Sequence, residues 1–228
     1  GVPSIVKPAS QTAYLTESMV KSIIQSNILP EGSLQLICGG VGDLLDHMTG
    51  QDVVTFTGSA ETGLKLKSHP AILMNNTRFN MEADSLNCSI LGMDVKPEDE
   101  EFGLFVKEVV REMTSKTGQK CTAIRRIFVP ENLQEAVIKS LKEKLSTITI
   151  GDPSLKEVRM GPLASLDQVE EVKRNVELLQ KSADLVHGSF DGFKPLGQGA
   201  EQGAFFPPFL LHCQNPLDSK EAHSVEPF

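Results

Sequence analysis

The sequence has 228 residues, of which 39% are hydrophobic and 23% are charged, and its formal net charge is −8. Such values are ordinary for a globular chain, and the acidic balance provides no basic stripe for a nucleic-acid backbone. No apolar run approaches the roughly 20 residues that span a bilayer, so neither nucleic-acid nor membrane partners are expected.

The cysteines lie far apart in the sequence and form no CxxC pair; they are Cys38, Cys88, Cys121 and Cys213. This spacing favours neither a disulfide framework nor a zinc site, and it predicts a reducing, cytoplasmic location. Both ends lack the polar, exposed character of natural domain boundaries. We therefore expect the chain to be a fragment of a longer protein.

Short apolar runs alternate with helical patterns in the first part of the chain. Strands are predicted at residues 2–7, 34–38, 53–57, 72–74 and 88–91, and helices at 13–26, at 43–48 and from about 59 to 68. This alternation predicts an α/β fold with a parallel sheet that is covered by helices on both faces.

A composition shift follows, because the acidic segment MDVKPEDEE leads into the amphipathic pattern FGLFVKEVVREM. Beyond it, the pattern predicts a strand at 124–129, helices at 133–145 and about 167–180, and loop with short strands over the Gly- and Pro-rich residues 188–208. Two domains are predicted, at residues 1–93 and 94–228.

Cys121 lies in TGQKCTAIRR, between a predicted helix and a predicted strand, with Lys120, Arg125 and Arg126 nearby in sequence. Thiolates are nucleophiles, and positive charge or a helix end stabilises them. The local sequence alone still favours the commoner alternative, a small buried residue without chemistry.

Glu82, in NMEAD, stands between apolar residues, where partial burial would make its carboxylate a stronger general base. Asp84 lies two residues further along. The alternative is a solvated acid in a loop, and periodicity alone does not exclude it.

The segment FTGSAETG carries Thr57, Gly58 and Ser59 from a strand into a helix. Such a turn presents backbone N–H groups and the positive end of a helix dipole to an anion, although simple helix capping uses the same residues. The Walker spacing is absent, which argues against an ATPase. Lys7 ends a predicted strand, where open α/β sheets place ligands, but a surface lysine is equally compatible.

Five elements occur in an order typical of the aldehyde dehydrogenase superfamily: IVKPAS, FTGSAETG, the MEAD glutamate, GQKCTAIRR and HSVEPF. The chain resembles this superfamily over essentially its whole length. The resemblance implies a partial, Rossmann-like NAD(P)-binding domain at residues 1–93. It also implies a thiol-bearing α/β catalytic domain at 94–228 that is truncated at its C-terminus.

The resemblance assigns cofactor contacts to particular positions. Lys7 matches the lysine that hydrogen-bonds the adenosine ribose, and Ser59, with Thr57 and Gly58 in the same turn, matches the pyrophosphate contact. Glu226 matches the acid that holds the nicotinamide ribose and would otherwise be interpreted as a loop acid. A homo-oligomeric parent is also implied.

Catalysis is assigned in the same way, with Cys121 as the nucleophile and Glu82 as the general base. The thiolate would attack an aldehyde, hydride would leave for the nicotinamide, and water activated by Glu82 would hydrolyse the thioester. The Cys121 N–H would supply half of an oxyanion hole. The other half in this family is an asparagine that precedes this chain, so the 228-residue chain alone is expected to be inactive.

Two departures from the common family pattern point to a subgroup. EADS replaces Glu-Leu-Gly-Gly, and the separation of Glu82 from Cys121 is a few residues longer than usual. Both features resemble enzymes of CoA-linked semialdehydes in aromatic degradation. These include the dehydrogenase half of the bifunctional phenylacetyl-CoA ring-opening enzyme and 3,4-dehydroadipyl-CoA semialdehyde dehydrogenase. A small-molecule aldehyde, possibly linked to CoA, is the implied substrate.

Ser10 bears on the choice of cofactor. NAD-preferring relatives often carry a glutamate at this position, where a carboxylate would repel a 2′-phosphate. Serine leaves room, so we predict NADP as the preferred cofactor, with NAD also possible. Two alternatives stay open: a CoA-acylating enzyme, which typically lacks the glutamate base, and a non-catalytic structural protein with the same fold.

Overall fold

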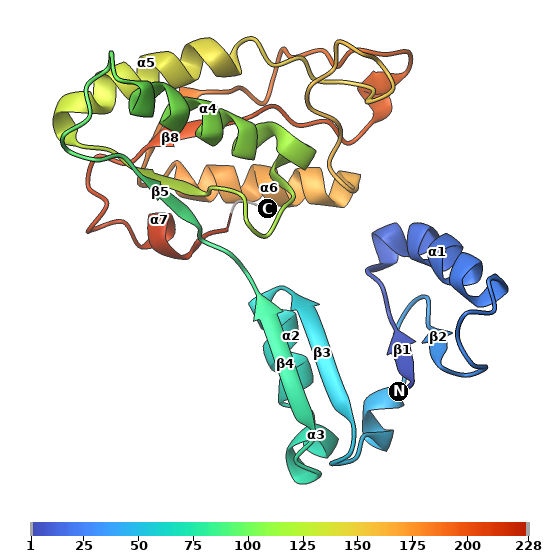
Figure 1. Ribbon diagram of the computed structural model, residues 1–228. Helices are drawn as coiled ribbons and strands as arrows, with labels where there is room; N and C mark the ends of the chain where they lie inside the picture. Colours follow the sequence, from blue (N-terminus) through green and yellow to red (C-terminus); the bar gives the residue numbers. More distant parts are fainter. Residues whose placement is uncertain (1, 227–228) are drawn as a thin grey trace. The chain divides into compact units, whose positions relative to one another are not determined.

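The computed structural model describes residues 2–226. The chain forms two compact units, Gly1–Asp84 and Ser85–Phe228, which are described separately (Figure 1). The predicted boundary after residue 93 concerns the domains of a longer protein and stays a prediction.

In the first unit, β1 (Ser4–Val6) pairs in parallel with β2 (Leu34–Leu36), and α1 (Ala13–Gln25) connects the two strands. Parallel strands need such a crossover, because a tight turn can join only antiparallel neighbours. The 3₁₀ helices Ser10–Thr12 and Leu44–His47 follow the two strands. These elements confirm the predicted alternation of strands and helices.

The second strand pair of this unit is β3 (Val53–Gly58) with β4 (Arg78–Ala83), again parallel. Between them lie α2 (Ala60–Lys67) and α3 (Pro70–Met74). Gly63 lets α2 approach β4 closely, because a Cβ at this position would lie 2.7 Å from the Met81 Cε.

One predicted element of this pair is wrong. The strand expected at residues 72–74 is helix α3, because Pro70 occupies its first turn, where the fixed φ of proline favours helix formation. The strand lies further along as β4, and it contains Glu82.

The second unit is built around α4 (Glu100–Thr114) and α5 (Gln134–Leu145), beside the parallel pair β5 (Cys88–Ile90) and β6 (Arg126–Phe128). Apolar residues three and four apart bury one face of each helix in a shared core. That core includes Phe102, Phe105, Val106, Val109, Val137, Leu141 and Leu145.

The rest of this unit contains α6 (Leu166–Leu179), the antiparallel pair β7 (Asp184–His187) and β8 (Leu210–His212), and α7 (Lys220–Ser224). A second core joins α6 to three phenylalanine rings, with centroids 4.9 to 6.2 Å apart. Short 3₁₀ helices occupy Ser115–Gly118, Glu131–Leu133 and Ala200–Gln202.

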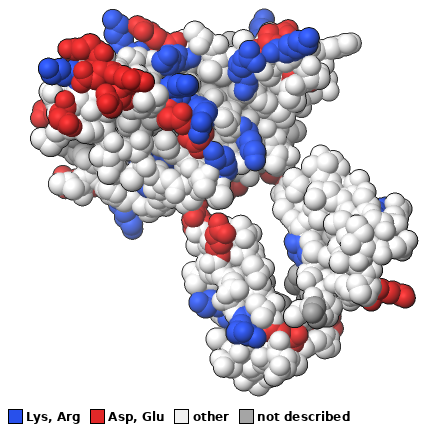
Figure 2. Space-filling view, viewed as in Figure 1, with Lys and Arg blue, Asp and Glu red and all other residues white. Residues whose placement is uncertain are grey.

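The surface of the second unit carries both signs of charge on the face that Figure 2 draws, with acidic and basic side chains interspersed. Within residues 2–226, no helix combines the length and apolar character that crossing a membrane requires.

Candidate functional site

Cys121 lies in an exposed turn between the 3₁₀ helix Ser115–Gly118 and β6. Three consecutive residues of this segment have left-handed backbones, Lys116 (φ 52°), Thr117 (φ 59°) and Gly118 (φ 74°). For residues other than glycine this conformation costs on the order of 1–3 kcal/mol each, and such strain concentrates at functional sites. The turn is therefore held in shape by its surroundings.

Contacts from a distant segment hold the first half of the turn. The Thr117 hydroxyl donates to the Gly161 carbonyl at 2.8 Å, and the Gln119 amide donates to the Pro162 carbonyl at 3.3 Å. The Gln119 Oε1 in turn accepts the N–H of Ala164 at 2.8 Å. These bonds fix the backbone immediately before the cysteine.

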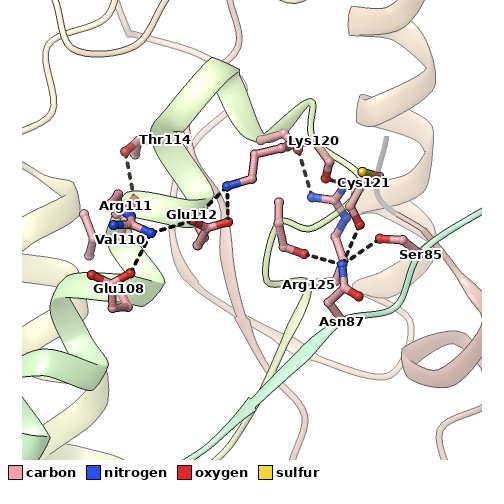
Figure 3. A network of polar contacts seen from close by, with 12 residues as sticks. Ser85, Asn87, Glu108, Val110, Arg111, Glu112, Thr114, Lys120, Cys121 and Arg125 are labelled. Atoms are coloured by element: carbon pink, nitrogen blue, oxygen red, sulfur yellow. Dashed lines mark hydrogen bonds and ion pairs between the residues drawn. The ribbon is translucent and has the colours of Figure 1, made fainter.

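Asn87, just before β5, holds the second half. Its Nδ2 donates to the carbonyls of Cys121 at 2.6 Å and Ala123 at 3.2 Å, as Figure 3 shows for the former. Its own carbonyl accepts the backbone N–H groups of Arg125 at 2.9 Å and Arg126 at 3.1 Å. Asn87 therefore joins the start of β5 to Cys121 and to the residues that follow it.

Arg125 fills the interior of the turn, with its side chain only 5% exposed. Its Nη1 donates to the Gly118 carbonyl at 2.9 Å and its Nη2 to the Lys120 carbonyl at 3.1 Å. A Glu226 carboxylate oxygen lies 3.7 Å from Nη2. Burial lowers the pKa of Arg125, and the Glu226 carboxylate opposes that shift; arginine stays charged at neutral pH.

Lys120, by contrast, is engaged with α4. Its Nζ lies 2.9 and 2.7 Å from the two carboxylate oxygens of Glu112, whose side chain is only 9% exposed (Figure 3). The hydrogen bond from Lys120, with a further one from Arg111, holds the pKa of Glu112 below its usual range despite the opposing effect of burial.

The three basic residues that the sequence places near Cys121 therefore differ in role. The charge of Lys120 is balanced by Glu112, and the Arg126 guanidinium donates to the Ala222 carbonyl. Arg125 donates to the carbonyls of Gly118 and Lys120, which lie on either side of Gln119. Of the three basic side chains, Arg125 is therefore the one that holds the backbone just before Cys121, and its own charge is partnered by Glu226.

The Glu112–Lys120 pair gives a testable prediction for stability. We expect Glu112→Gln to lower the free energy of unfolding by about 1–2 kcal/mol at neutral pH, because a charge-assisted hydrogen bond is lost. A lowered carboxyl pKa stabilises the fold above the ordinary range of the carboxyl, and this contribution disappears as the pH falls through the lowered value. The difference between the two proteins, measured by urea unfolding, should therefore shrink below about pH 4.

Glu108→Gln is the control, because its partner Arg111 is 60% exposed and such surface pairs contribute little. A difference for Glu112→Gln that is unchanged from pH 7 to pH 3 would contradict the assignment.

In the first unit, Glu82 lies on β4 opposite Thr57 of β3, and Ala83 lies opposite Gly58. The carboxylate therefore stands beside the turn that begins α2. Glu82 is exposed in this chain, so the expected partial burial is not observed. The alternative of a solvated loop acid agrees with this exposure, but Glu82 belongs to a strand rather than to a loop.

The start of α2 differs from the open anion site that the sequence predicts. The Ser59 Oγ accepts the N–H of Thr62 at 3.3 Å, and the Asp84 carboxylate accepts the N–H of Ala60 at 3.0 Å. Asp84 reaches it from a left-handed position, with φ of 51°. Two N–H groups of the first turn are therefore already bonded, one of them to a carboxylate.

Thr57, Gly58 and Ser59 are all exposed at the carboxyl end of β3. Lys7 directly follows β1 and Ser10 begins the next 3₁₀ helix; both are exposed. The structure thus brings Glu82 to the Thr57–Ser59 turn, within one unit.

Glu226 belongs to the second unit, where the Asn175 Nδ2 donates to its backbone carbonyl at 3.0 Å. Arg125 links it to the turn of Cys121. The structure thus brings the predicted nucleophile and the predicted ribose acid to a common arginine.

A cavity of about 420 Å³ lies among the helices and strands of the second unit. It borders Arg125 and Gly118, but its lining is largely apolar and does not include Cys121. Within residues 2–226, no group of three or more His, Cys, Asp or Glu side chains is placed to hold a metal ion. The candidate nucleophile therefore lies in the turn at residues 116–125, the thiol turn, and not in this cavity.

Comparison with protein families identifies the chain, because the model of the aldehyde dehydrogenase family matches residues 1–228. The chain belongs to the aldehyde dehydrogenase family. Its similarity to 3,4-dehydroadipyl-CoA semialdehyde dehydrogenase of Aromatoleum evansii is 44% identity over 228 residues, all of this chain and 44% of that protein. A putative aldehyde dehydrogenase of Staphylococcus aureus is 27% identical over 215 residues, 92% of this chain and 43% of its own length.

Solved structures of this family share the fold. A mutant of aldehyde dehydrogenase C from Pseudomonas syringae, in complex with NAD+ and octanal, is 25% identical with a TM-score of 0.76, over 92% of this chain and 41% of that chain. Betaine aldehyde dehydrogenase from Staphylococcus aureus, in complex with NAD+, has a TM-score of 0.79 at 24% identity. The match covers 96% of this chain and 43% of that chain. The predicted α/β fold class and the predicted family are confirmed, and this aldehyde dehydrogenase chain spans under half the length of these relatives.

Proposed function

We propose that this chain belongs to an NAD(P)-dependent enzyme that oxidises an aldehyde to its carboxylic acid through a thioester on Cys121. The observation that carries the proposal is the thiol turn: an exposed cysteine on a strained backbone whose neighbouring carbonyls are fixed by Asn87 and Arg125. A purely structural cysteine requires no such arrangement.

Each step of the reaction uses a group of this chain. The Cys121 Sγ forms a bond to the aldehyde carbon, and the carbonyl electron pair moves to the oxygen to give a thiohemiacetal anion. Hydride release from this carbon would need an acceptor, which a bound oxidised nicotinamide would supply. Glu82 then takes a proton from water, whose oxygen attacks the thioester carbon and displaces the Cys121 thiolate.

The end of β3 is the position that we propose for a dinucleotide, where its pyrophosphate would compete with the Asp84 carboxylate for the Ala60 N–H. Thr57, Gly58 and Ser59 are exposed where a parallel strand gives way to a helix, the usual place for such ligands in α/β sheets. Lys7 and Ser10 occupy the equivalent position after β1, where Lys7 would contact the adenosine ribose. Glu226 would hold the nicotinamide ribose.

The substrate that we propose is a CoA-linked semialdehyde from aromatic degradation. Its support is the 44% identity to a protein named 3,4-dehydroadipyl-CoA semialdehyde dehydrogenase, together with the EADS sequence after β4. The four cysteines are free, which fits a reducing compartment such as the cytoplasm. A homo-oligomer is proposed from the family.

Cofactor choice and product together test the proposal. With the full-length protein and a CoA-linked semialdehyde, we expect kcat/KM to be higher with NADP than with NAD, because Ser10 leaves room for the 2′-phosphate. A Ser10→Glu variant should reverse that preference by roughly tenfold or more, because its carboxylate would repel the phosphate. Initial rates with both cofactors, and chromatography of the product, are the measurements.

Two results would overturn parts of the proposal. Equal or better turnover of the unmodified protein with NAD would refute the NADP preference. A requirement for free coenzyme A, with an acyl-CoA as the product of aldehyde oxidation, would identify the CoA-acylating class instead; Glu82 favours hydrolysis. Absence of any turnover would favour a structural role for the fold.

A further inference from the structure

Arg125 contacts the peptide group between Lys120 and Cys121. The proposed reaction would use the N–H of this group, and Arg125 bonds to its carbonyl. A peptide unit is planar and trans, so the Lys120 carbonyl and the Cys121 N–H lie in one plane and point in opposite directions. The Arg125 Nη2 and the Ala123 N–H both donate to that carbonyl, at 3.1 and 2.9 Å. Within residues 2–226, the Cys121 N–H itself has no hydrogen-bond acceptor.

We infer that Arg125 is a positioning residue for the oxyanion of the proposed reaction, acting through the Lys120–Cys121 peptide. This inference rests on the proposed function, in which the Cys121 N–H donates to the thiohemiacetal oxygen. A charged donor on a carbonyl polarises the whole peptide group, because hydrogen bonds in a chain strengthen one another. The N–H at the other end then becomes a better donor to a developing negative charge.

The surroundings of Arg125 make its donors fixed rather than mobile. Its side chain is 5% exposed, and its Nη1 also holds the Gly118 carbonyl at 2.9 Å, on the strained part of the turn. Glu226, at 3.7 Å, supplies the countercharge. Donors that need no reorganisation during the reaction are the ones that stabilise a transition state most.

The arrangement predicts that two reactions of the same thiol depend differently on Arg125. Attack on an activated ester such as 4-nitrophenyl acetate forms an S–C bond, moves the carbonyl pair onto oxygen, and then expels 4-nitrophenolate. Attack on iodoacetamide forms an S–C bond while iodide leaves with the electron pair of the C–I bond. Only the first reaction passes through an oxyanion, and neither requires the cofactor.

The test uses Arg125→Met and Arg125→Lys in the full-length protein without cofactor. For Arg125→Met, we expect acylation by 4-nitrophenyl acetate to slow by about tenfold, less than the roughly hundredfold loss of a direct oxyanion donor. Alkylation of Cys121 by iodoacetamide at the same pH should stay within about twofold. The acylation rate of Arg125→Lys should lie between those of the unmodified protein and Arg125→Met. One ammonium group cannot reproduce the two hydrogen bonds that a planar guanidinium makes.

Arg159→Gln is the matched control, because Arg159 is an exposed arginine that donates to the Lys156 carbonyl, away from the turn. Both of its rates should be unchanged. The acylation-to-alkylation ratio is the decisive quantity, since loss of folded protein lowers both rates together and leaves the ratio intact. Arg125→Lys keeps the test informative if Arg125→Met does not fold.

A ratio that is unchanged in both Arg125 variants would overturn the inference, whether the separate rates fall or not. Failure of the proposed function has a different signature. If Cys121→Ala still releases 4-nitrophenolate from 4-nitrophenyl acetate at the unmodified rate, Cys121 is not the nucleophile and the proposed function is wrong. If Cys121→Ala abolishes both while the Arg125 ratio does not change, only the role of Arg125 is wrong.

Discussion

Replacing Cys121 with serine in the full-length protein is expected to lower aldehyde oxidation by at least a factor of about a thousand. A hydroxyl is a far weaker nucleophile than a thiol near neutral pH, and within residues 2–226 no side-chain base is hydrogen-bonded to the side chain at position 121. The measurement is the steady-state formation of reduced cofactor, with circular dichroism to show that the variant is folded.

Cys38→Ser is the matched control, because Cys38 is also exposed but lies outside the thiol turn. Its activity should stay within about twofold of the unmodified protein. Iodoacetamide, followed by peptide mass spectrometry, should label Cys121 before Cys38, Cys88 or Cys213. Equal labelling of the four thiols, or substantial activity of Cys121→Ser, would contradict the assignment of the nucleophile.

Glu82→Gln should separate the two halves of the reaction. A general base contributes on the order of 10²–10⁴ to the step it assists, so we expect steady-state turnover to fall by at least about a hundredfold. Formation of the thioester does not need this base, so mixing enzyme with aldehyde and cofactor should still give a burst of reduced cofactor close to one equivalent per site. Stopped-flow absorbance measures both phases.

The control is Glu31→Gln, an exposed carboxylate in the same unit that lies outside the β3–β4 pair. Its burst and its steady state should match those of the unmodified protein. Loss of the burst in Glu82→Gln, to the same extent as loss of turnover, would mean that Glu82 acts before the thioester forms. Full activity would remove Glu82 from the mechanism.

The helices with strong periodicity were predictable from sequence. FGLFVKEVVREM places apolar side chains three and four positions apart, and α4 buries that face as expected. The segment around Pro70 was not predictable from periodicity, because Ala71 to Met74 are apolar enough for a short strand, and Pro70 at the first helical position is what favours a helix there. Because the strand was predicted at residues 72–74 instead of at Arg78–Ala83, Glu82 was left outside any predicted strand.

Most contacts around the Cys121 thiol could not be predicted from the residues near it in sequence. Asn87 contacts the Cys121 carbonyl across 34 positions, and its type alone gives no indication of that contact. Asp84 could have been found, because an aspartate tolerates a left-handed backbone and commonly bonds to helix N–H groups. The pairing of Glu112 with Lys120 was also missed, because it joins a helix to a turn rather than two residues on one helix face.

The dependence of the thiol turn on Gly161, Pro162 and Ala164 has a consequence for synthesis of the protein. When the growing chain has emerged from the ribosome only as far as Cys121, residues 161–164 have not yet emerged. Their two carbonyls and one N–H are then not available to hold the turn. At that stage the left-handed backbone of Lys116 and Thr117 lacks the contacts that Gly161, Pro162 and Ala164 provide in the folded chain. The cysteine would thus emerge as an ordinary thiol and acquire its environment only once the segment up to Ala164 has folded against it.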